Sequence, residues 1–383
     1  MKNLPELRFK EFSGKRKEEK LKDVEWVELS EVAEVIAGQS PEGKYYNVTG
    51  EGMPFHQGKT EFTNMYLGKP RMWTKKITKI AEQGDILMSV RAPVGPVNIT
   101  TEEICIGRGL ASIRANKIGQ IFLFHYLKSI EDKVSGNGGA VFDSISKKQI
   151  EELKIKLPCK QEQQKIASFL SAIDKKIELT DKRLEYLESY KKGLMQKLLT
   201  GEIRFPGFND EWKQEKLEDI LTEYNEKNIN NYRQYTIGKN GIFPINNSRY
   251  NIINHKIFKL NNLILGIGID EININTNILK GSCSPIYKVC KINTDILNPK
   301  FGSYYIKIKI NKEKNKICKK SSRREFEIIY KNFLELKIKL PCKQEQQKIA
   351  SFLSAIDKKI ELTKSRLENL KSYKKGLLQK MFV

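Results

Sequence analysis

The sequence predicts an α/β protein with two mixed α/β domains separated by two long α-helices that pack as an antiparallel coiled coil. The first observation is a repeat: a 29-residue segment that begins at Glu152 begins again, without substitution, at Glu335. The second is an apolar period of 3.5 residues that starts in each copy and continues beyond it. The third is the strong divergence of the segments outside the copies. Together these observations predict an internal pseudo-two-fold repeat.

The two long helices are predicted to begin just after a proline. Pro158 and Pro341 follow the short extended run KIKL in each copy. Proline is excluded from a helix interior but tolerated at the first turn. No Gly or Pro then interrupts the first copy before Gly193. Each helix is therefore expected to contain about 40 residues and to be about 60 Å long.

Apolar residues recur along both helices in alternating steps of four and three, which is a heptad seam. Thr180 and Lys191 occupy the two seam positions that are not apolar, and Thr363 and Lys374 do so in the second copy. Because the chain supplies two such helices, we expect them to bury each other's seams in an antiparallel pair; homodimerisation through the seams is the alternative. The seam residues are Ile166, Leu170, Ile173, Ile177, Leu184 and Leu187, and Ile349, Leu353, Ile356, Ile360, Leu367 and Leu370.

The repeat extends beyond the helices. The segment LRFKEF at Leu7–Phe12 matches IRFPGF at Ile203–Phe208, and in the same register EKL ending at Leu21 matches EKL ending at Leu217. Each half therefore contains a short leading motif, a variable module and a long helix. The predicted boundaries are 1–150 for the first module, 151–200 for the first helix, 201–333 for the second module and 334–383 for the second helix.

Both modules contain short β-branched runs separated by turn residues, which is typical of strands. Each also contains one longer helical pattern, at residues 118–134 and 298–313. The modules are therefore predicted to be mixed α/β. The expected strands lie within 30–38, 84–90, 95–101 and 109–115 in the first module and within 234–238, 262–269 and 284–292 in the second.

The charge indicates a polyanionic partner. The chain has 69 Lys and Arg against 46 Asp and Glu, a net charge of +23, and basic residues that neutralise phosphates release counterions. An anionic membrane surface, RNA or an inert basic surface would fit the charge alone. If the partner is DNA, Arg reads guanine, Asn reads adenine and Lys contacts phosphate. The candidate residues are Lys59, Lys69, Arg71, Arg91, Arg108 and Arg114 in the first module, and Arg233, Asn246, Asn247, Arg249, Arg323 and Arg324 in the second.

Several other classes of protein are not favoured. There is no apolar run of 18 residues and no apolar core near the N-terminus, so we expect neither a membrane span nor a secretory signal. None of the six Cys stands at CxxC spacing and there are three His, which indicates reduced thiols, a cytoplasmic location and no metal site.

No catalytic centre is evident. GQSPEGKY at Gly38–Tyr45 has the P-loop glycine and lysine spacing but lacks the Ser or Thr that would hold Mg²⁺. LILGIGID at Leu263–Asp270 has an isolated GxG, and the Asn/Asp-Pro-Pro-aromatic tetrapeptide of amine methyltransferases does not occur. We therefore expect a non-enzymatic chain.

The parts together resemble the specificity subunits of type I restriction–modification systems. The resemblance lies in LPCKQEQQKIASFLSAIDKKIE on the helix, in LLTGEIRFPGF after it, and in the Trp of VEWVELSEVAEV and DEWKQEKLEDIL. GDILMSVRAPVGPVNIT is similar to a strand pair of the target-recognition domains of that family. The second module departs from the family here, because NNLILGIGIDEINI replaces the usual GDILxS form.

The resemblance implies that each module is a target-recognition domain that reads one half of a bipartite sequence in double-stranded DNA. The helices would set the spacer and dock two modification subunits, which bring S-adenosylmethionine and methylate an adenine in each half. Restriction subunits would add ATP- and Mg-dependent translocation and cleavage, while this chain would bind no cofactor. The alternatives are a homodimerising coiled-coil adaptor with non-specific nucleic-acid binding and a stand-alone DNA-modifying enzyme.

Overall fold

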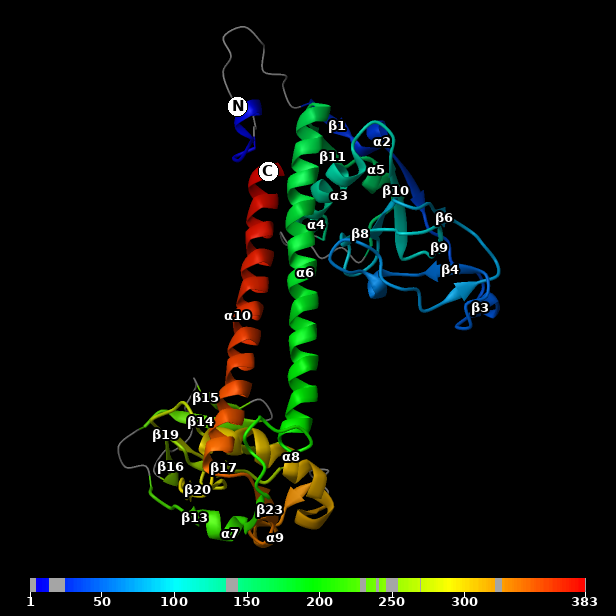
Figure 1. The fold of residues 1–383 in the computed structure, drawn as a ribbon. Helices are drawn as coiled ribbons and strands as arrows, with labels where there is room; N and C mark the ends of the chain where they lie inside the picture. Colours follow the sequence, from blue (N-terminus) through cyan, green and yellow to red (C-terminus); the bar gives the residue numbers. More distant parts are fainter. Residues whose placement is uncertain are drawn as a thin grey trace. The chain divides into compact units, whose positions relative to one another are not determined.

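The computed structural model divides the chain into two compact units. The first comprises Met1–Leu184 with Thr363–Val383, and the second comprises Glu185–Leu362. Each unit contains one α/β module and one end of each long helix, α6 and α10 (Figure 1). The structure describes residues 5–13, 25–135, 144–227, 232–238, 241–245, 254–268, 270–320 and 326–382.

The module of the first unit is built on two sheets. A four-stranded antiparallel sheet has the order β2 (Ala33–Ala37), β10 (Leu110–Ala115), β7 (Ile86–Ser89), β8 (Val97–Ile99). A five-stranded sheet, in which β4 and β9 run parallel, has the order β3 (Tyr46–Asn47), β5 (Trp73–Thr74), β4 (Met53–His56), β9 (Ile104–Ile106), β6 (Ile80–Ala81). The short helices are α1 (Lys10–Ser13), α2 (Leu29–Val32), η1 (Gly43–Tyr45), η2 (Lys59–Glu61), α3 (Gln120–Ser129), α4 (Glu131–Val134) and α5 (Lys147–Glu151).

The module of the second unit is also built on two sheets, here of four strands each. The antiparallel sheet has the order β13 (Leu221–Glu223), β20 (Lys288–Ile292), β17 (Leu263–Leu265), β18 (Ile272–Ile274). The other, in which β14 and β19 run parallel, has the order β15 (Gly241–Pro244), β14 (Gln234–Gly238), β19 (Lys280–Cys283), β16 (Lys256–Lys259). A two-stranded ladder joins β21 (Cys318–Lys319) to β22 (Glu327–Ile328), and the helices are α7 (Leu217–Ile220), α8 (Pro299–Ile317) and α9 (Tyr330–Leu334).

The predicted mixed α/β class is confirmed in both modules. The run ILMS forms β7 with all four residues buried, as expected for an inner strand covered on both faces. The helical pattern at 118–134 forms α3 and α4 with a break at Ile130, whose backbone leaves the helical region. The pattern at 298–313 forms the longer helix α8, which Asn298 caps by accepting a hydrogen bond from the Phe301 amide.

The long helices α6 (Lys160–Leu198) and α10 (Lys343–Phe382) run antiparallel, as predicted. In the first unit the start of α6, including Leu170, packs with the end of α10, including Leu378 and Phe382. In the second unit the end of α6 at Leu198 packs with the start of α10 at Leu353. Because the seams are buried within the chain, homodimerisation through them is not favoured. Among the predicted seam residues, Leu184, Leu187, Ile360 and Leu370 are half-buried, and the other eight are buried.

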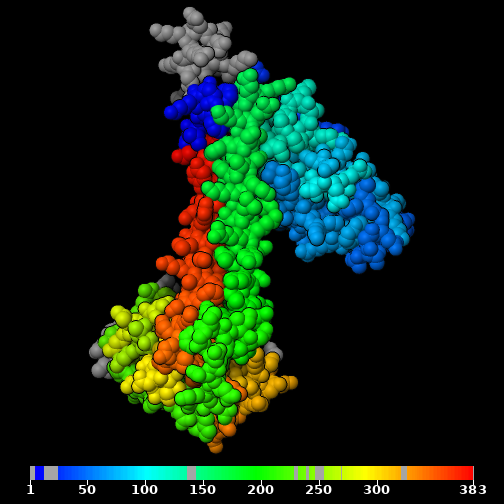
Figure 2. All heavy atoms as spheres, in the orientation of Figure 1, coloured from blue at the N-terminus to red at the C-terminus, as the bar shows by residue number. Residues whose placement is uncertain are grey.

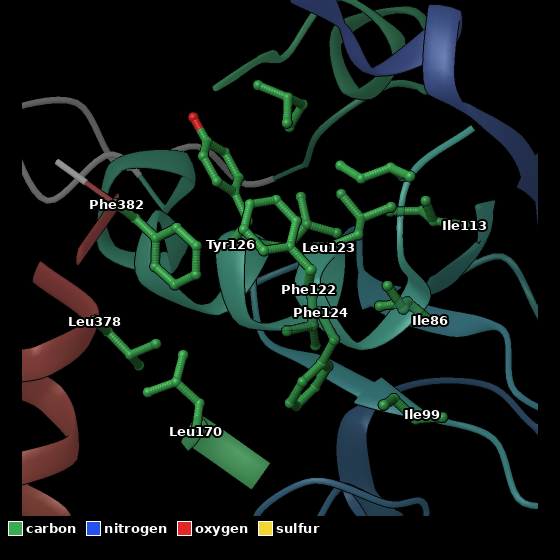
Figure 3. Packing of buried hydrophobic residues seen from close by; sticks show 14 of the residues in the cluster. Ile86, Ile99, Ile113, Phe122, Leu123, Phe124, Tyr126, Leu170, Leu378 and Phe382 are labelled. Atoms are coloured by element: carbon green, nitrogen blue, oxygen red, sulfur yellow. The ribbon is translucent and has the colours of Figure 1, made fainter. Parts of the chain in front are cut away.

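The helix of each module, α3 or α8, also packs against the long helices. A coiled coil of two helices alone would not make this contact. In the first unit the rings of Phe122 and Tyr126 on α3 lie 5.4 and 5.5 Å from the ring of Phe382. Figure 3 shows these three rings together, with Leu170 and Leu378 beside them. The first module is thus fixed to the helices by one continuous apolar core.

The two polar seam lysines both form ion pairs. Lys374 Nζ lies 2.5 Å from Asp174 in the first unit, and Lys191 Nζ lies 2.5 Å from Asp357 in the second. Lys191 and Lys374 are repeat counterparts, as are the two aspartates, because each pair is 183 residues apart. The same ion pair therefore forms once in each unit, and it favours the observed register of the two helices.

The leading motif docks in the same way in both halves. Arg8 forms two hydrogen bonds to Glu162, and Arg204 forms two to Glu345. The Leu7 amide donates to the Lys380 carbonyl at the end of α10, close to the contact seen in Figure 2 between the blue segment and the red helix end. The Ile203 amide donates correspondingly to the carbonyl of Lys197 on α6.

The structure corrects one match between the two halves of the repeat, that of Leu21 with Leu217. β1 (Glu25–Glu28) pairs with β11 (Lys154–Leu157) as β12 (Lys213–Lys216) pairs with β23 (Lys337–Leu340). The Leu29 amide donates to the Leu153 carbonyl, and the Leu217 amide donates to that of Leu336. Leu217 therefore corresponds to Leu29 and not to Leu21. The sequence match at Leu21 was wrong because the first half has extra residues between its leading motif and its first strand.

The two glutamines that follow the buried glutamates fix the module helices to the long helices. Gln163 accepts a hydrogen bond from the amide of Gly119, the residue before α3, at 2.9 Å. Gln346 accepts one from the amide of Asn298, the residue before α8, at 2.8 Å. An unpaired amide at each helix start is thereby satisfied from the duplicated segment, so two unlike modules attach through one set of contacts.

Candidate nucleic-acid interface

A hollow of about 320 Å³ opens on the first module. It lies where the end of β4, the turn η2 and the segment before β5 come together. The amide of Gly68 donates to the carbonyl of Glu61, which closes the loop between these segments. The hollow is lined by Phe55, Gln57, Gly58, Thr60, Glu61, Arg71 and Met72.

A half-buried carboxylate lies beside the arginine of this hollow. Glu61 lies between two basic groups, with one oxygen 3.6 Å from Arg71 Nε and the other 3.4 Å from His56 Nδ1. Burial lowers the pKa of His56, which keeps its ring neutral at pH 7. The Arg71 side chain is 72% exposed. The Nε edge of its guanidinium therefore faces Glu61, while most of the side chain is accessible to a ligand.

A glycine-bounded loop brings two further arginines to the same region. The Gly107 amide donates to the His56 carbonyl, and a Cβ at Gly109 would lie 2.2 Å from the Gln57 carbonyl oxygen, so glycine is needed there. This close approach places the backbone of Arg108 against Gln57 and Gly58. The Val90 amide donates to the Gly109 carbonyl, which places Arg91, the next residue, near the same loop. The side chains of Arg91 and Arg108 are both exposed.

The lysines predicted to contact phosphate are close in sequence to residues that line the hollow. Lys59 begins the turn η2, and Lys69 precedes Arg71 by two residues. Both side chains are exposed. Five of the six candidates in the first module are therefore exposed. Lys59 stands between the lining residues Gly58 and Thr60, and the backbone on either side of Arg108 lies against Gln57.

Arg114 is the exception in the first module. Its guanidinium donates to both oxygens of Asp85 at 3.0 and 2.9 Å and also pairs with Glu82 at 2.8 Å. Asp85 is 3% exposed and also accepts from Ser112. The hydrogen bond to Asp85 raises the pKa of Arg114. These contacts give Arg114 a structural role at the edge of β10, and we leave it out of the interface.

In the second module, one of the six candidate residues, Arg233, lies among the described residues. Arg233 is exposed, and its carbonyl accepts from the Ser282 amide beside β14. Sequence reasoning missed a basic and aromatic group formed by Lys259 on β16, Lys291 on β20 and Tyr224, the residue after β13. The two Lys Nζ atoms lie 5.0 and 4.9 Å from the centre of the Tyr224 ring. Asn246, Asn247, Arg249, Arg323 and Arg324 lie outside the described residues.

Comparison with known proteins identifies the family. The family model of the type I restriction modification DNA specificity domain matches residues 21–189 and again residues 209–372, one match on each half of the repeat. The chain belongs to this family. Each α/β module with the first part of its long helix is thus one specificity domain.

Individual relatives agree with this assignment. The chain is 49% identical over 187 residues to the MjaX specificity subunit of a type I restriction enzyme from Methanocaldococcus jannaschii, covering 48% of this chain and 44% of the relative. It is 29% identical over 231 residues to the MjaIX specificity subunit from the same organism, covering 52% of each. The chain thus spans about half the length of the curated relatives it matches. A crystal structure of the type I restriction-modification system S subunit from M. genitalium has the same fold, with a TM-score of 0.62, 16% identity and 99% coverage of both chains.

The nucleotide-like motifs of the specificity domains are ordinary loops. After Gly38, whose amide donates to the Leu110 carbonyl, the P-loop-like segment forms the three-residue 3₁₀ helix η1 and then strand β3, and not the α-helix that follows a P-loop. The GxG segment follows β17 and turns back into β18. Among the described residues there is no cluster of three potential metal ligands and no helix long and apolar enough to cross a membrane.

Sequence reasoning also missed Gln57, Thr60 and Glu61 in the first specificity domain. They line the hollow with Arg71, which it did select. The available signal was the polar run after the strand-like Met53–His56, where an amide and a hydroxyl flank Gly58 and Lys59. That run alone does not indicate that Arg71 folds back onto it.

Proposed function

We propose that this chain is the DNA sequence-specificity subunit of a type I restriction–modification complex. Each specificity domain would read one half of a bipartite DNA target, and the paired helices would set the length of the unread spacer. The observation that carries this proposal is the attachment of two unlike modules to duplicated helices by equivalent contacts, namely the Arg–Glu pairs and the Gln163 and Gln346 hydrogen bonds.

The charge and the exposed groups of the first domain support DNA as the ligand. The net charge of +23 favours a polyanion. The interface also presents groups suited to two tasks, because lysines contact phosphates while planar side chains such as Arg71 and Gln57 read base edges. A surface that bound nucleic acid only through charge would not need such a shaped, mixed hollow.

The partners and cofactors follow as part of the same proposal. Two modification subunits would dock on the helices and adjoining surfaces, bring S-adenosylmethionine and methylate an adenine in each half-site after flipping it from the duplex. Restriction subunits would use ATP and Mg. This chain would contribute recognition without catalysis, and it would bind neither cofactor.

Two measurements test the proposal. The full chain, tagged and expressed in its native host, should co-purify with modification subunits in stoichiometric amount, and the methylome of that host should show one bipartite motif that disappears when the chain is deleted. A homodimerising adaptor would co-purify without a methyltransferase and leave the methylome unchanged. Methylation or nicking by the purified chain alone would contradict a non-catalytic role.

A further inference from the structure

We propose that the hollow of the first domain reads one G·C base pair, with Arg71 contacting the guanine and Glu61 the cytosine. This inference rests on the proposed function and extends it, because it assigns two residues to one base pair of the target. It starts from the geometry of the hollow, in which an exposed guanidinium and a carboxylate stand side by side.

The composition of the hollow favours a base edge over a phosphate. A phosphate site is lined by donors and positive charge, whereas this hollow includes the carboxylate of Glu61, which would repel a phosphate oxygen. A base pair presents donors and acceptors together. In the major groove guanine offers the acceptors O6 and N7, and its partner cytosine offers the amino group N4 as a donor.

The available atoms of the hollow match that pattern. Nε of Arg71 is the atom that faces Glu61, and the side chain is 72% exposed, so its terminal nitrogens can donate in parallel to O6 and N7. Glu61 retains acceptor capacity on both oxygens, since its contacts to Arg71 and His56 are long, at 3.6 and 3.4 Å. The Glu61 side chain is still 12% exposed, so cytosine N4 has access to it.

His56 acts as a positioning residue in this arrangement. It is 2% exposed and lies under Glu61, so it does not reach the DNA itself. Gln57 and Thr60 are exposed on the same rim and would contact the neighbouring base pair. Lys59, Lys69 and Arg108 are exposed and belong to segments next to lining residues. They would contact phosphates, which positions the protein without specifying sequence.

The experiment selects from a randomised duplex library with the purified full chain and its single-site variants. The wild-type chain should enrich a bipartite sequence with G·C fixed at one position of one half-site. Arg71→Ala should lose that preference by about 5- to 150-fold at that position and leave the other half-site unchanged. Arg71→Lys should retain only part of the preference, because an ammonium cannot donate as a planar fork.

Lys69→Ala is the matched control, because Lys69 is an exposed basic residue two positions before Arg71 and does not line the hollow. It should weaken all sequences evenly and reduce the slope of log affinity against log salt by about 1. If Arg71→Ala behaves like Lys69→Ala, or if the base preference is unchanged, the inference is wrong while the proposed function stands. If the wild-type chain enriches no sequence, the proposed function itself fails. Because Arg71 is exposed, circular dichroism of the variant should match the wild type.

Discussion

The two units use the same ion pair in different surroundings. In the first, Asp174 accepts hydrogen bonds from Lys374 and from Asn64 of the module, and both charged side chains are nearly buried, at 4% and 5% exposure. In the second, Asp357 accepts from Tyr304 of the module and pairs with Lys191, with 39% and 22% exposure. The same helix residues therefore form a buried ion pair in one unit and a partly hydrated one in the other, because the two modules cover them to different extents.

The module residue that faces the aspartate explains part of this difference. In the first unit it is His125, fully buried, with Nδ1 3.9 Å from Asp174 and no hydrogen bond to either ring nitrogen from the described residues. In the second it is Tyr304, whose hydroxyl reaches Asp357 at 2.5 Å and Ser354 at 3.3 Å. A duplicated helix can thus accept unlike modules when one polar position on each module adapts to the shared aspartate.

Removing the buried lysine of the first unit should cost more stability than the other changes proposed below. Lys374→Ala leaves Asp174 buried with a neutral partner, and losing one member of a buried pair costs about 3–5 kcal/mol. Lys191→Ala, the matched substitution in the second unit, should cost about 1 kcal/mol or less, since Asp357 is partly hydrated. Urea unfolding followed by hydrogen exchange and mass spectrometry measures the loss for each unit separately. Equal losses in the two units would contradict the comparison.

A smaller effect is expected from pH. Burial, with Lys374 and Lys128 nearby, lowers the pKa of His125 to about 3. Below its ordinary pKa near 6.5, the unfolded chain takes up a proton that the folded chain does not. The His125 contribution to folding stability is therefore complete above pH 6.5 and decreases as the pH falls toward 3, by at most about 1.4 kcal/mol per pH unit.

The control for this pH effect is His125→Phe, which keeps a ring in the cavity and removes the titration. Urea unfolding of the first unit between pH 7 and pH 4.5 should show a shallower pH dependence in the variant than in the wild type. The second unit, with Tyr304 at the corresponding place, should show the same pH dependence in both proteins. An unchanged pH dependence of the first unit in the variant would show that His125 is not the group responsible.

Much of the helical part of the fold could be predicted from the sequence, because a repeated 29-residue segment with a heptad period specifies its own partner. The prolines gave the helix starts, and Lys191 and Lys374 stood out as polar positions in an apolar seam. Their partners could not be predicted, since Lys374 meets an aspartate 200 residues away. That contact depends on the antiparallel register, which the pattern of apolar residues alone does not fix.

For the candidate interface, the sequence indicates which types of residue to expect but not which individual arginines are accessible. Counting arginines in the first module selected Arg71 and Arg108 but also Arg114, whose partner Asp85 is 29 residues away and buried under β10. Whether an arginine is free or paired depends on such distant contacts. Glu61 and Gln57 were missed because neither is basic, and their relation to Arg71 arises when the chain folds back at Gly68.

In the proposed function, the paired helices set the spacer and the two modules read the half-sites independently. The most direct test inserts one heptad into each helix, after Leu184 in α6 and after Leu362 in α10, so that the seam period is kept. Each helix then lengthens by about 10 Å, or roughly three base pairs of duplex. Methylome sequencing of cells with this variant should show both half-sites unchanged and a longer spacer. Altered half-sites with an unchanged spacer would contradict the account.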